Sequence, residues 1–101
     1  MYYTIAIFGK TIDESWNFLM SLINEIPYGK IKTVSNANNI HRVGLHDGTI
    51  YIAATCNDHF RGIKFHKAYV SKNIPKEDYW YIHIGICPWN DVEDDNWMEF
   101  Y

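Results

Sequence analysis

Cysteine and histidine are the residue types in this chain with the clearest capacity for metal chemistry. Cys56, His59 and His66 fall within one stretch of eleven residues, and thiolate and imidazole are the ligands that zinc prefers in proteins. The spacing Cys56-x-x-His59 suits half of a zinc site, but no Cys-x-x-Cys pair accompanies it. We therefore expect neither a metal nor another cofactor, and a metal-dependent hydrolase built on these three residues remains an alternative.

Gly9-Lys10-Thr11 raises the question of a phosphate-binding loop. That loop needs a further glycine five positions before Gly9, so that successive backbone amides can surround phosphate oxygens, but Thr4 occupies the position. The sequence instead predicts a strand-to-helix turn in which Thr11 caps the helix and Glu14 completes a capping box. No glycine frames a serine in the manner of a nucleophile elbow, and we expect no enzymatic activity.

The charged residues are distributed unevenly along the chain. All nine Lys and Arg lie between Lys10 and Lys76, where five acids accompany them, so this part carries a net charge of +4. From Glu77 onward seven acids and no base give a net charge of −7. The overall net charge of −3 therefore conceals a strongly dipolar chain, and such a separation affects partners and encounter rather than fold.

The acidic end of the chain is also rich in aromatic residues. Aromatic rings among carboxylates suit docking onto a basic surface, because charge steers the encounter and the rings provide desolvated anchors. Carboxylates can also take the place of nucleic-acid phosphates in a basic channel. A second, compatible interpretation is that Trp97 and Phe100 fold back onto the sheet. The predicted partner-binding residues are Trp89, Asp91, Glu93, Asp94, Asp95, Trp97, Glu99 and Phe100.

The stretch from residue 59 to residue 76 is the basic counterpart of this end. Its lysines, arginine and interleaved aromatic residues could follow a nucleic-acid backbone, which makes a nucleotide or nucleic-acid binding module an alternative function. The acidic isoelectric point of about 5.9 argues against a dedicated nucleic-acid binder, and lysines that protect an edge strand explain the same pattern. The candidate residues for this alternative are Arg61, Lys64, Lys67 and Lys72.

Two stretches, Asp47–Ala54 and Arg61–Val70, resemble a segment of phage terminase-type P-loop ATPases. In those enzymes a hairpin strand leads through an Arg-Gly pair to a hydrophobic strand, which ends in the acidic pair that holds magnesium and activates water. Ser71 and Lys72 stand at the positions of that pair here. The resemblance, with Thr4–Ile26 in place of the first strand and helix, implies a small and catalytically silent relative.

Size, this resemblance and the acidic end together lead us to expect a small phage-encoded interaction protein without enzymatic activity. The expected partner is a host protein with a basic surface, such as a nucleic-acid-handling defence complex, which the chain would inhibit in the manner of an anti-CRISPR protein. We expect it in the cytoplasm of the infected bacterial cell, because no apolar run is long enough to span a bilayer and the amino terminus shows no signal-peptide pattern.

The hydrophobic pattern predicts the elements that position these residues. A strand over residues 2–8 precedes an amphipathic helix from about Ile12 to Ile26, which ends before Pro27. Asp47-Gly48 predicts a hairpin turn. Further strands are predicted over residues 30–35, 40–45, 49–54, 67–71 and 79–86.

These elements predict one domain over residues 1–101, with a core over 1–88 and an acidic aromatic segment over 89–101. The fold class is α/β or α+β, with a single sheet of about five to six strands and one long helix on one face. No predicted element covers the other face. We therefore expect a second helix, a partner or a homodimer mate to cover it.

Overall fold

The structure, a computed structural model, describes residues 3–37, 40–55, 64–79, 82 and 98–101 of the chain. It confirms the α+β class, with one α-helix packed on a single mixed sheet of six strands among the described residues. The elements in chain order are β1 (Tyr3–Gly9), α1 (Ile12–Ile23), the 3-10 helix η1 (Tyr28–Lys30), β2 (Ile31–Ala37), β3 (Ile40–Leu45), β4 (Thr49–Thr55), β5 (Lys67–Val70), the 3-10 helix η3 (Lys76–Asp78) and β6 (Met98–Phe100).

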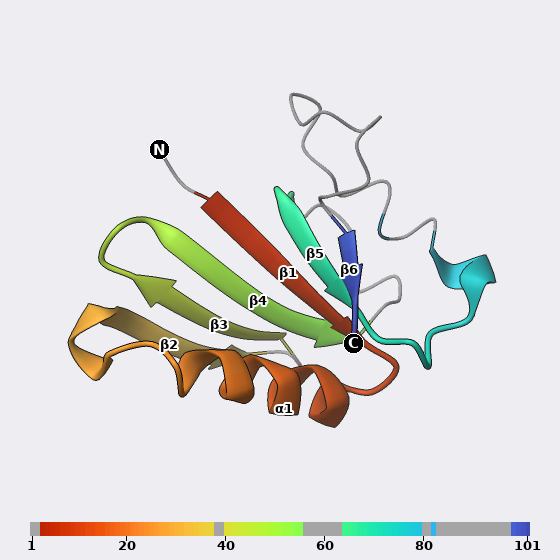
Figure 1. Cartoon of the computed structure of the whole chain (residues 1–101), viewed down its shortest axis with the longest axis horizontal. Helices are drawn as coiled ribbons and strands as arrows, with labels where there is room; N and C mark the ends of the chain where they lie inside the picture. Colours follow the sequence, from red (N-terminus) through yellow and green to blue (C-terminus); the bar gives the residue numbers. More distant parts are fainter. Residues whose placement is uncertain (1–2, 38–39, 56–63, 80–81, 83–97) are drawn as a thin grey trace.

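The strand order in the sheet is β2-β3-β4-β1-β5-β6, so that β2 and β6 lie at opposite ends of the fan of strands in Figure 1. Strands β4, β1, β5 and β6 run parallel, whereas β2–β3 and β3–β4 are antiparallel. The predicted hairpin between β3 and β4 is confirmed. Gly48 adopts a φ of 96° in its turn, which glycine tolerates without a steric penalty, and the Asp47 carboxylate accepts a hydrogen bond from the amide of Thr49 at 2.8 Å.

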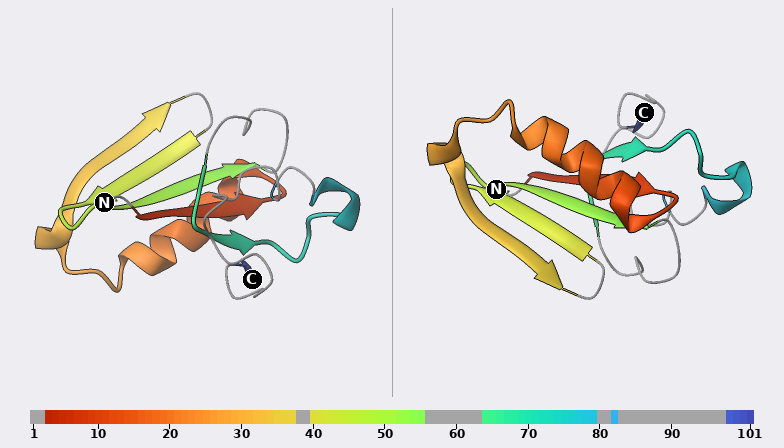
Figure 2. Two further views of the ribbon diagram at one scale, coloured as in Figure 1. Left: turned by 90° about the horizontal axis from the view of Figure 1, so that it is seen from above. Right: turned by 90° about the horizontal axis from the view of Figure 1, so that it is seen from below.

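Strand β1 lies at the centre of the sheet and is buried on both faces, as its continuous run of apolar residues predicts. Ala6, Ile7 and Phe8 are fully buried, and Ile5 is nearly so. Helix α1 crosses one face of the sheet (Figure 2) and ends at Ile23, earlier than predicted. The amides of Glu25 and Ile26 bond to carbonyls three residues back in a tightened turn, because Pro27 disfavours helical geometry at the residue before it.

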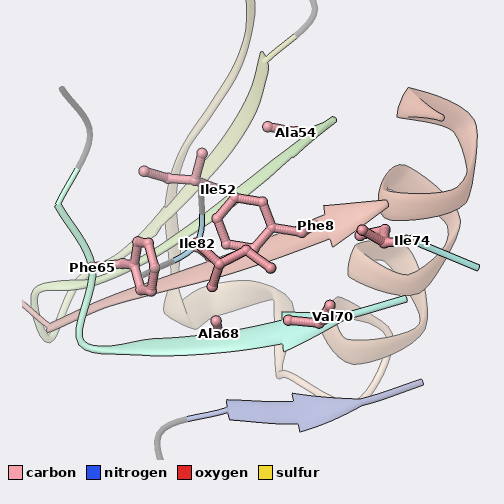
Figure 3. Close-up of a cluster of buried hydrophobic side chains, with 9 residues drawn as sticks. Phe8, Ile52, Ala54, Phe65, Ala68, Val70, Ile74 and Ile82 are labelled. Carbon is pink, nitrogen blue, oxygen red and sulfur yellow. The ribbon is translucent and has the colours of Figure 1, made fainter. Parts of the chain in front are cut away.

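The face of the sheet that we expected to lack a cover is covered by the chain itself. Phe65, Ile74 and Ile82 lie over β1, β4 and β5 there and are almost completely buried, together with the strand residues beneath them (Figure 3). Phe8 and Phe65 meet edge to face with their centroids 5.5 Å apart, a favourable geometry for aromatic rings. This finding removes the argument for a homodimer through an uncovered face.

Two further predictions need correction. The stretch 79–86 was expected to form a strand, but Tyr79 lies in a turn after η3, and the amide of Ile82 bonds back to the Tyr79 carbonyl at 3.0 Å in a helical turn; the other residues of that stretch lie outside the described ones. The sixth strand comes from Met98–Phe100, where no strand was predicted. Three residues are too few to display the period of two on which strand prediction depends.

Within the described ranges, no helix is long and apolar enough to cross a membrane.

Candidate functional site

Strand β6 brings the acidic end of the chain against the basic segment. It pairs in parallel with β5, so that Tyr69 lies beside Glu99. The Lys67 ammonium lies 3.7 Å from the Glu99 carboxylate and 4.9 Å from the centroid of the Tyr69 ring. Burial by itself lowers the pKa of Lys67, but the hydrogen bond with Tyr69 and the charge of Glu99 outweigh it, and the pKa is raised overall. The two poles of the dipolar sequence therefore meet at this edge of the sheet.

Tyr101 fastens the end of β6 to the rest of the fold. Its ring stacks on Phe18 of α1, with centroids 4.0 Å apart and planes 5° from parallel. Its hydroxyl donates a hydrogen bond to the Phe8 carbonyl at 2.8 Å, and its amide donates to the Val70 carbonyl at 3.0 Å. Burial raises the pKa of Tyr101, and the negative charge of Glu14 adds to the effect. This residue therefore joins β6 to the helix, to β1 and to β5.

The described residues on either side of the stretch 83–97 belong to one hydrophobic cluster. Ile82 is completely buried in the cluster on the face away from α1, and Met98 packs against the same cluster. Residues 83–97, which the structure does not describe, therefore connect two points of a single core. Six of the predicted partner-binding residues belong to this stretch, and the described residues on either side of it lie in one cluster.

Two of the eight predicted partner-binding residues lie in the described part of the chain. Glu99 has a side chain that is 56% exposed although it pairs with Lys67. Phe100 is 47% exposed, and its ring lies 6.0 Å from that of Tyr79. Neighbouring residues of a strand point to opposite faces, so these two side chains present a charge on one side of β6 and a ring on the other. The remaining six lie outside the described residues: Trp89, Asp91, Glu93, Asp94, Asp95 and Trp97.

The basic residues proposed for nucleic-acid binding do not converge where they are described. Lys67 begins β5 and Lys72 follows its end, which separates their backbone positions by about 16 Å of extended chain. Lys67 is occupied by Glu99 and Tyr69, whereas Lys64 and Lys72 are exposed. Arg61 lies outside the described residues. The described lysines of this alternative are therefore spread along β5 and beyond both of its ends.

The metal-site alternative can be followed only at His66. Its Nδ1 accepts a hydrogen bond from the Thr4 amide at 3.1 Å, and its ring stacks on Tyr3 with centroids 5.2 Å apart. Cys56 and His59 lie outside the described residues. Among the residues that are described, no three His, Cys, Asp or Glu side chains are grouped to hold a metal ion. His66 thus holds β1 and the start of β5 together in this structure.

The turn between β1 and α1 forms the predicted N-cap at Thr11, but the Glu14 carboxylate reaches the amide of Lys10 where the amide of Thr11 was expected. The Thr11 hydroxyl accepts a hydrogen bond from the Glu14 amide at 3.2 Å, and the Glu14 carboxylate accepts one from the Lys10 amide at 3.0 Å. The same carboxylate accepts a bond from the Asn73 side chain at 2.7 Å. A hydrogen bond with Ser71 is the main cause that lowers the pKa of Glu14. A carboxylate of the chain itself therefore occupies the place at this helix terminus that a phosphate would need.

Ser71 has a structural role at this turn. It stands at one of the positions where the resemblance to terminase ATPases places an acid, and it is 1% exposed. Its hydroxyl accepts a hydrogen bond from the Asn73 amide at 3.1 Å and bonds with Glu14. It therefore links the end of β5 to the beginning of α1.

Sequence reasoning missed a groove at the opposite edge of the sheet. A cavity of about 480 Å³ lies between the second half of α1 and strands β2 and β3. Tyr28 and Val34 at its rim are 90% and 60% exposed. The periodicity of α1 assigned its apolar residues to the sheet, and nothing in the sequence indicated that β2 would stand far enough from the helix to leave this space. The groove is lined by Trp16, Met20, Ile23, Asn24, Ile26, Tyr28, Ile31, Val34 and Val43.

Comparison with known proteins adds no assignment to this geometry. No protein-family model, no curated protein and no solved structure matches the chain.

Proposed function

We propose that this chain is a non-enzymatic interaction protein whose acidic aromatic segment, residues 89–100, binds the basic surface of a nucleic-acid-handling protein. The observation that carries the proposal is the attachment of β6 to β5 and α1. It fixes the carboxyl end of the acidic segment at the sheet edge through Glu99 and Tyr101. A segment rich in charge and aromatic rings is thereby attached to a folded domain on both sides.

Attachment at both ends favours binding because the acidic segment then loses less conformational entropy when it docks on a partner. A free tail loses its conformational freedom when it docks, whereas a connection with both ends fixed in one cluster has already lost part of it. Ile82 and Met98 are the two fixed points. The carboxylates then steer the encounter with a basic partner, and the exposed ring of Phe100 offers apolar contact beside them.

Binding of this kind inhibits the partner by occupation of its nucleic-acid site. Five acids fall within residues 91–99, a charge density suited to lysines and arginines that otherwise hold phosphates. Host defence complexes that bind nucleic acid are the first class of partner to test.

The geometry supports this function better than the nucleic-acid-binding alternative. The central lysine of the basic segment, Lys67, is engaged by Glu99 and lies against Tyr69. A phosphate that approached Lys67 would have to displace a carboxylate of the chain itself. Glu99 lies beside this lysine, and its negative charge repels a polyanion.

Affinity capture with matched variants tests the proposal. The immobilised protein is exposed to a bacterial lysate, and bound proteins are eluted with duplex DNA or with RNA. Elution by nucleic acid of proteins that themselves bind nucleic acid is the expected result. Capture should be reduced in the variant Glu93→Gln, Asp94→Asn, Asp95→Asn and unchanged in the variant Asp13→Asn, Glu25→Gln, Glu77→Gln, which removes three exposed acids elsewhere. Equal capture by both variants would overturn the proposal.

A further inference from the structure

The two outer strands of the sheet carry opposite charges. Between Pro27 and His46, the stretch that holds β2 and β3, the chain has Lys30, Lys32 and Arg42 and no acid. At the other edge β6 presents Glu99, at the end of a stretch that contains seven acids and no base. Among the described strands, β2 and β6 are the two that pair on one side only. One molecule thus has a basic edge and an acidic edge.

Each of these edges also has an apolar side and a polar side. On β2, Val34 pairs with Val43 and faces the groove beside α1. Lys32 and Thr33 line a separate depression together with Asp47 and Ile50, and Ile50 packs on the face away from α1. On β6 the arrangement is reversed: Phe100 lies beside Val70 on the face away from α1, and Glu99 lies beside Tyr69 on the helix face.

We infer that β2 of one molecule receives β6 of a second copy in an antiparallel pair that extends the sheet, an inference independent of the proposed function. If the second copy keeps the same strand order but runs antiparallel, its sheet must be turned over. The helix face of the second copy then lies on the same side as the face away from α1 of the first. The turn places Phe100 of one copy over the groove beside Val34 of the next and Glu99 beside Lys32. A single arrangement therefore provides both the apolar contact of Phe100 with Val34 and the ion pair of Glu99 with Lys32.

The exposed fractions of these side chains agree with such a contact. Val34 is 60% exposed, Tyr28 90% and Phe100 47%, and their burial against one another removes apolar surface from water. Glu99 keeps its bond to Lys67 and has oxygens left for Lys32, since a carboxylate accepts several hydrogen bonds. Lysine on an exposed strand discourages pairing with a like edge, so Lys32 disfavours β2 against β2 and favours an acidic edge.

The contact joins two different surfaces of identical molecules. Such a head-to-tail contact builds open filaments, or a ring if the rotation between neighbours closes, and it does not build a closed dimer. Association should therefore increase with protein concentration without a limit at two copies. It should also weaken as salt rises, because the ion pairs lie at the surface.

Sedimentation velocity over a dilution series, at low and at high salt, tests the inference. The wild-type chain should show a weight-average sedimentation coefficient that rises with concentration at low salt and falls toward the monomer value at high salt. Lys32→Glu and Glu99→Lys should each remain monomeric alone, and an equimolar mixture of the two should associate again, since each then offers the charge that the other needs. Lys76→Glu, an exposed lysine in η3, serves as the control and should behave as wild type.

Two results would overturn the inference. One is a wild-type chain that stays monomeric at all concentrations in low salt. The other is association that persists in Glu99→Lys and disappears in Lys32→Glu, which would mean that Lys32 meets a surface other than Glu99 of β6. Val34→Asp tests the apolar contact at the groove without any change at β6. If the inference is correct, this variant remains monomeric.

Discussion

The ammonium of Lys67 and the carboxylate of Glu99 lie 3.7 Å apart, on neighbouring parallel strands whose sequences are 32 positions apart. The pair joins the most basic stretch of the chain to its most acidic one. Because the Glu99 side chain is 56% exposed, solvent screens the attraction, and the pair contributes little to the stability of the fold.

A double-mutant cycle should give this pair a small coupling energy. We expect Lys67→Met and Glu99→Gln to be coupled by roughly 0.2–1 kcal/mol in free energy of unfolding, the range for exposed ion pairs, with a smaller value at high salt. Denaturant unfolding of the four proteins measures it. A coupling energy that stays constant as salt rises would contradict the electrostatic interpretation.

Tyr101 should contribute through its ring more than through its hydroxyl. Tyr101→Phe keeps the stack on Phe18 and loses the bond to the Phe8 carbonyl, so it should cost about 1 kcal/mol. Tyr101→Ala also loses the stack, and we expect a loss of about 3 kcal/mol. Urea unfolding compares the two variants, and equal losses would contradict this division.

Titration should show that Tyr101 ionises at a higher pH than an ordinary tyrosine. Burial raises its pKa above the ordinary value of 10.0. The neutral form is therefore favoured in the folded protein, and stability from this group is present below pH 10 and declines as the pH rises above it. Absorbance at high pH should show that Tyr101→Phe removes ionisation that occurs above pH 10, and loss of ionisation at or below pH 10 would contradict the assignment.

The Glu14 carboxylate should make the protein sensitive to acid. Its pKa is lowered from the ordinary value of 4.5 by Ser71 in the first place. A lowered pKa contributes stability above the unfolded value, and this contribution is lost as the pH falls through the folded value, between about pH 5 and pH 3.

Glu14→Gln should therefore unfold more easily than wild type at pH 7 and show a flatter decline in stability with acid. Asp13→Asn, at an exposed position one residue earlier, is the control and should retain the wild-type slope. Identical pH profiles for Glu14→Gln and wild type would contradict the role assigned to this carboxylate.

Gly9 should tolerate no side chain. A Cβ there would lie 2.6 Å from the Thr11 carbonyl oxygen and 2.7 Å from the Ser15 amide nitrogen, both backbone atoms that cannot move aside. We expect Gly9→Ala to lose about 1–3 kcal/mol. At Gly29 a Cβ would meet nothing within 4 Å, so Gly29→Ala should stay within about 0.5 kcal/mol of wild type. Thermal unfolding of the two variants makes the comparison, and equal losses would contradict it.

Elements with a strong local signal could be predicted from the sequence. Thr11 caps α1 as predicted, with the Glu14 carboxylate on the Lys10 amide in place of the Thr11 amide, and Asp47-Gly48 forms the expected hairpin turn. The cover over the second face could not be predicted, because Phe65 and Ile74 come from stretches without a regular period and Ile82 from one predicted to be a strand, and only the tertiary fold brings the three together. The pairing of Glu99 with Lys67 also depends on the tertiary fold. It was therefore not evident in the charge pattern, which places Lys67 in the basic stretch and Glu99 in the acidic one.

Titration of a captured partner tests the central claim most directly. The partner eluted by nucleic acid is purified, labelled and titrated with the chain by fluorescence anisotropy at several salt concentrations. Removal of three carboxylates by Glu93→Gln, Asp94→Asn, Asp95→Asn should weaken binding about tenfold at low salt, at roughly 0.5 kcal/mol for each lost ion pair, and should reduce the dependence of affinity on salt. The control variant Asp13→Asn, Glu25→Gln, Glu77→Gln should bind as wild type does. Equal affinity of the two variants across all salt concentrations would contradict the claim that the acidic segment is the binding surface.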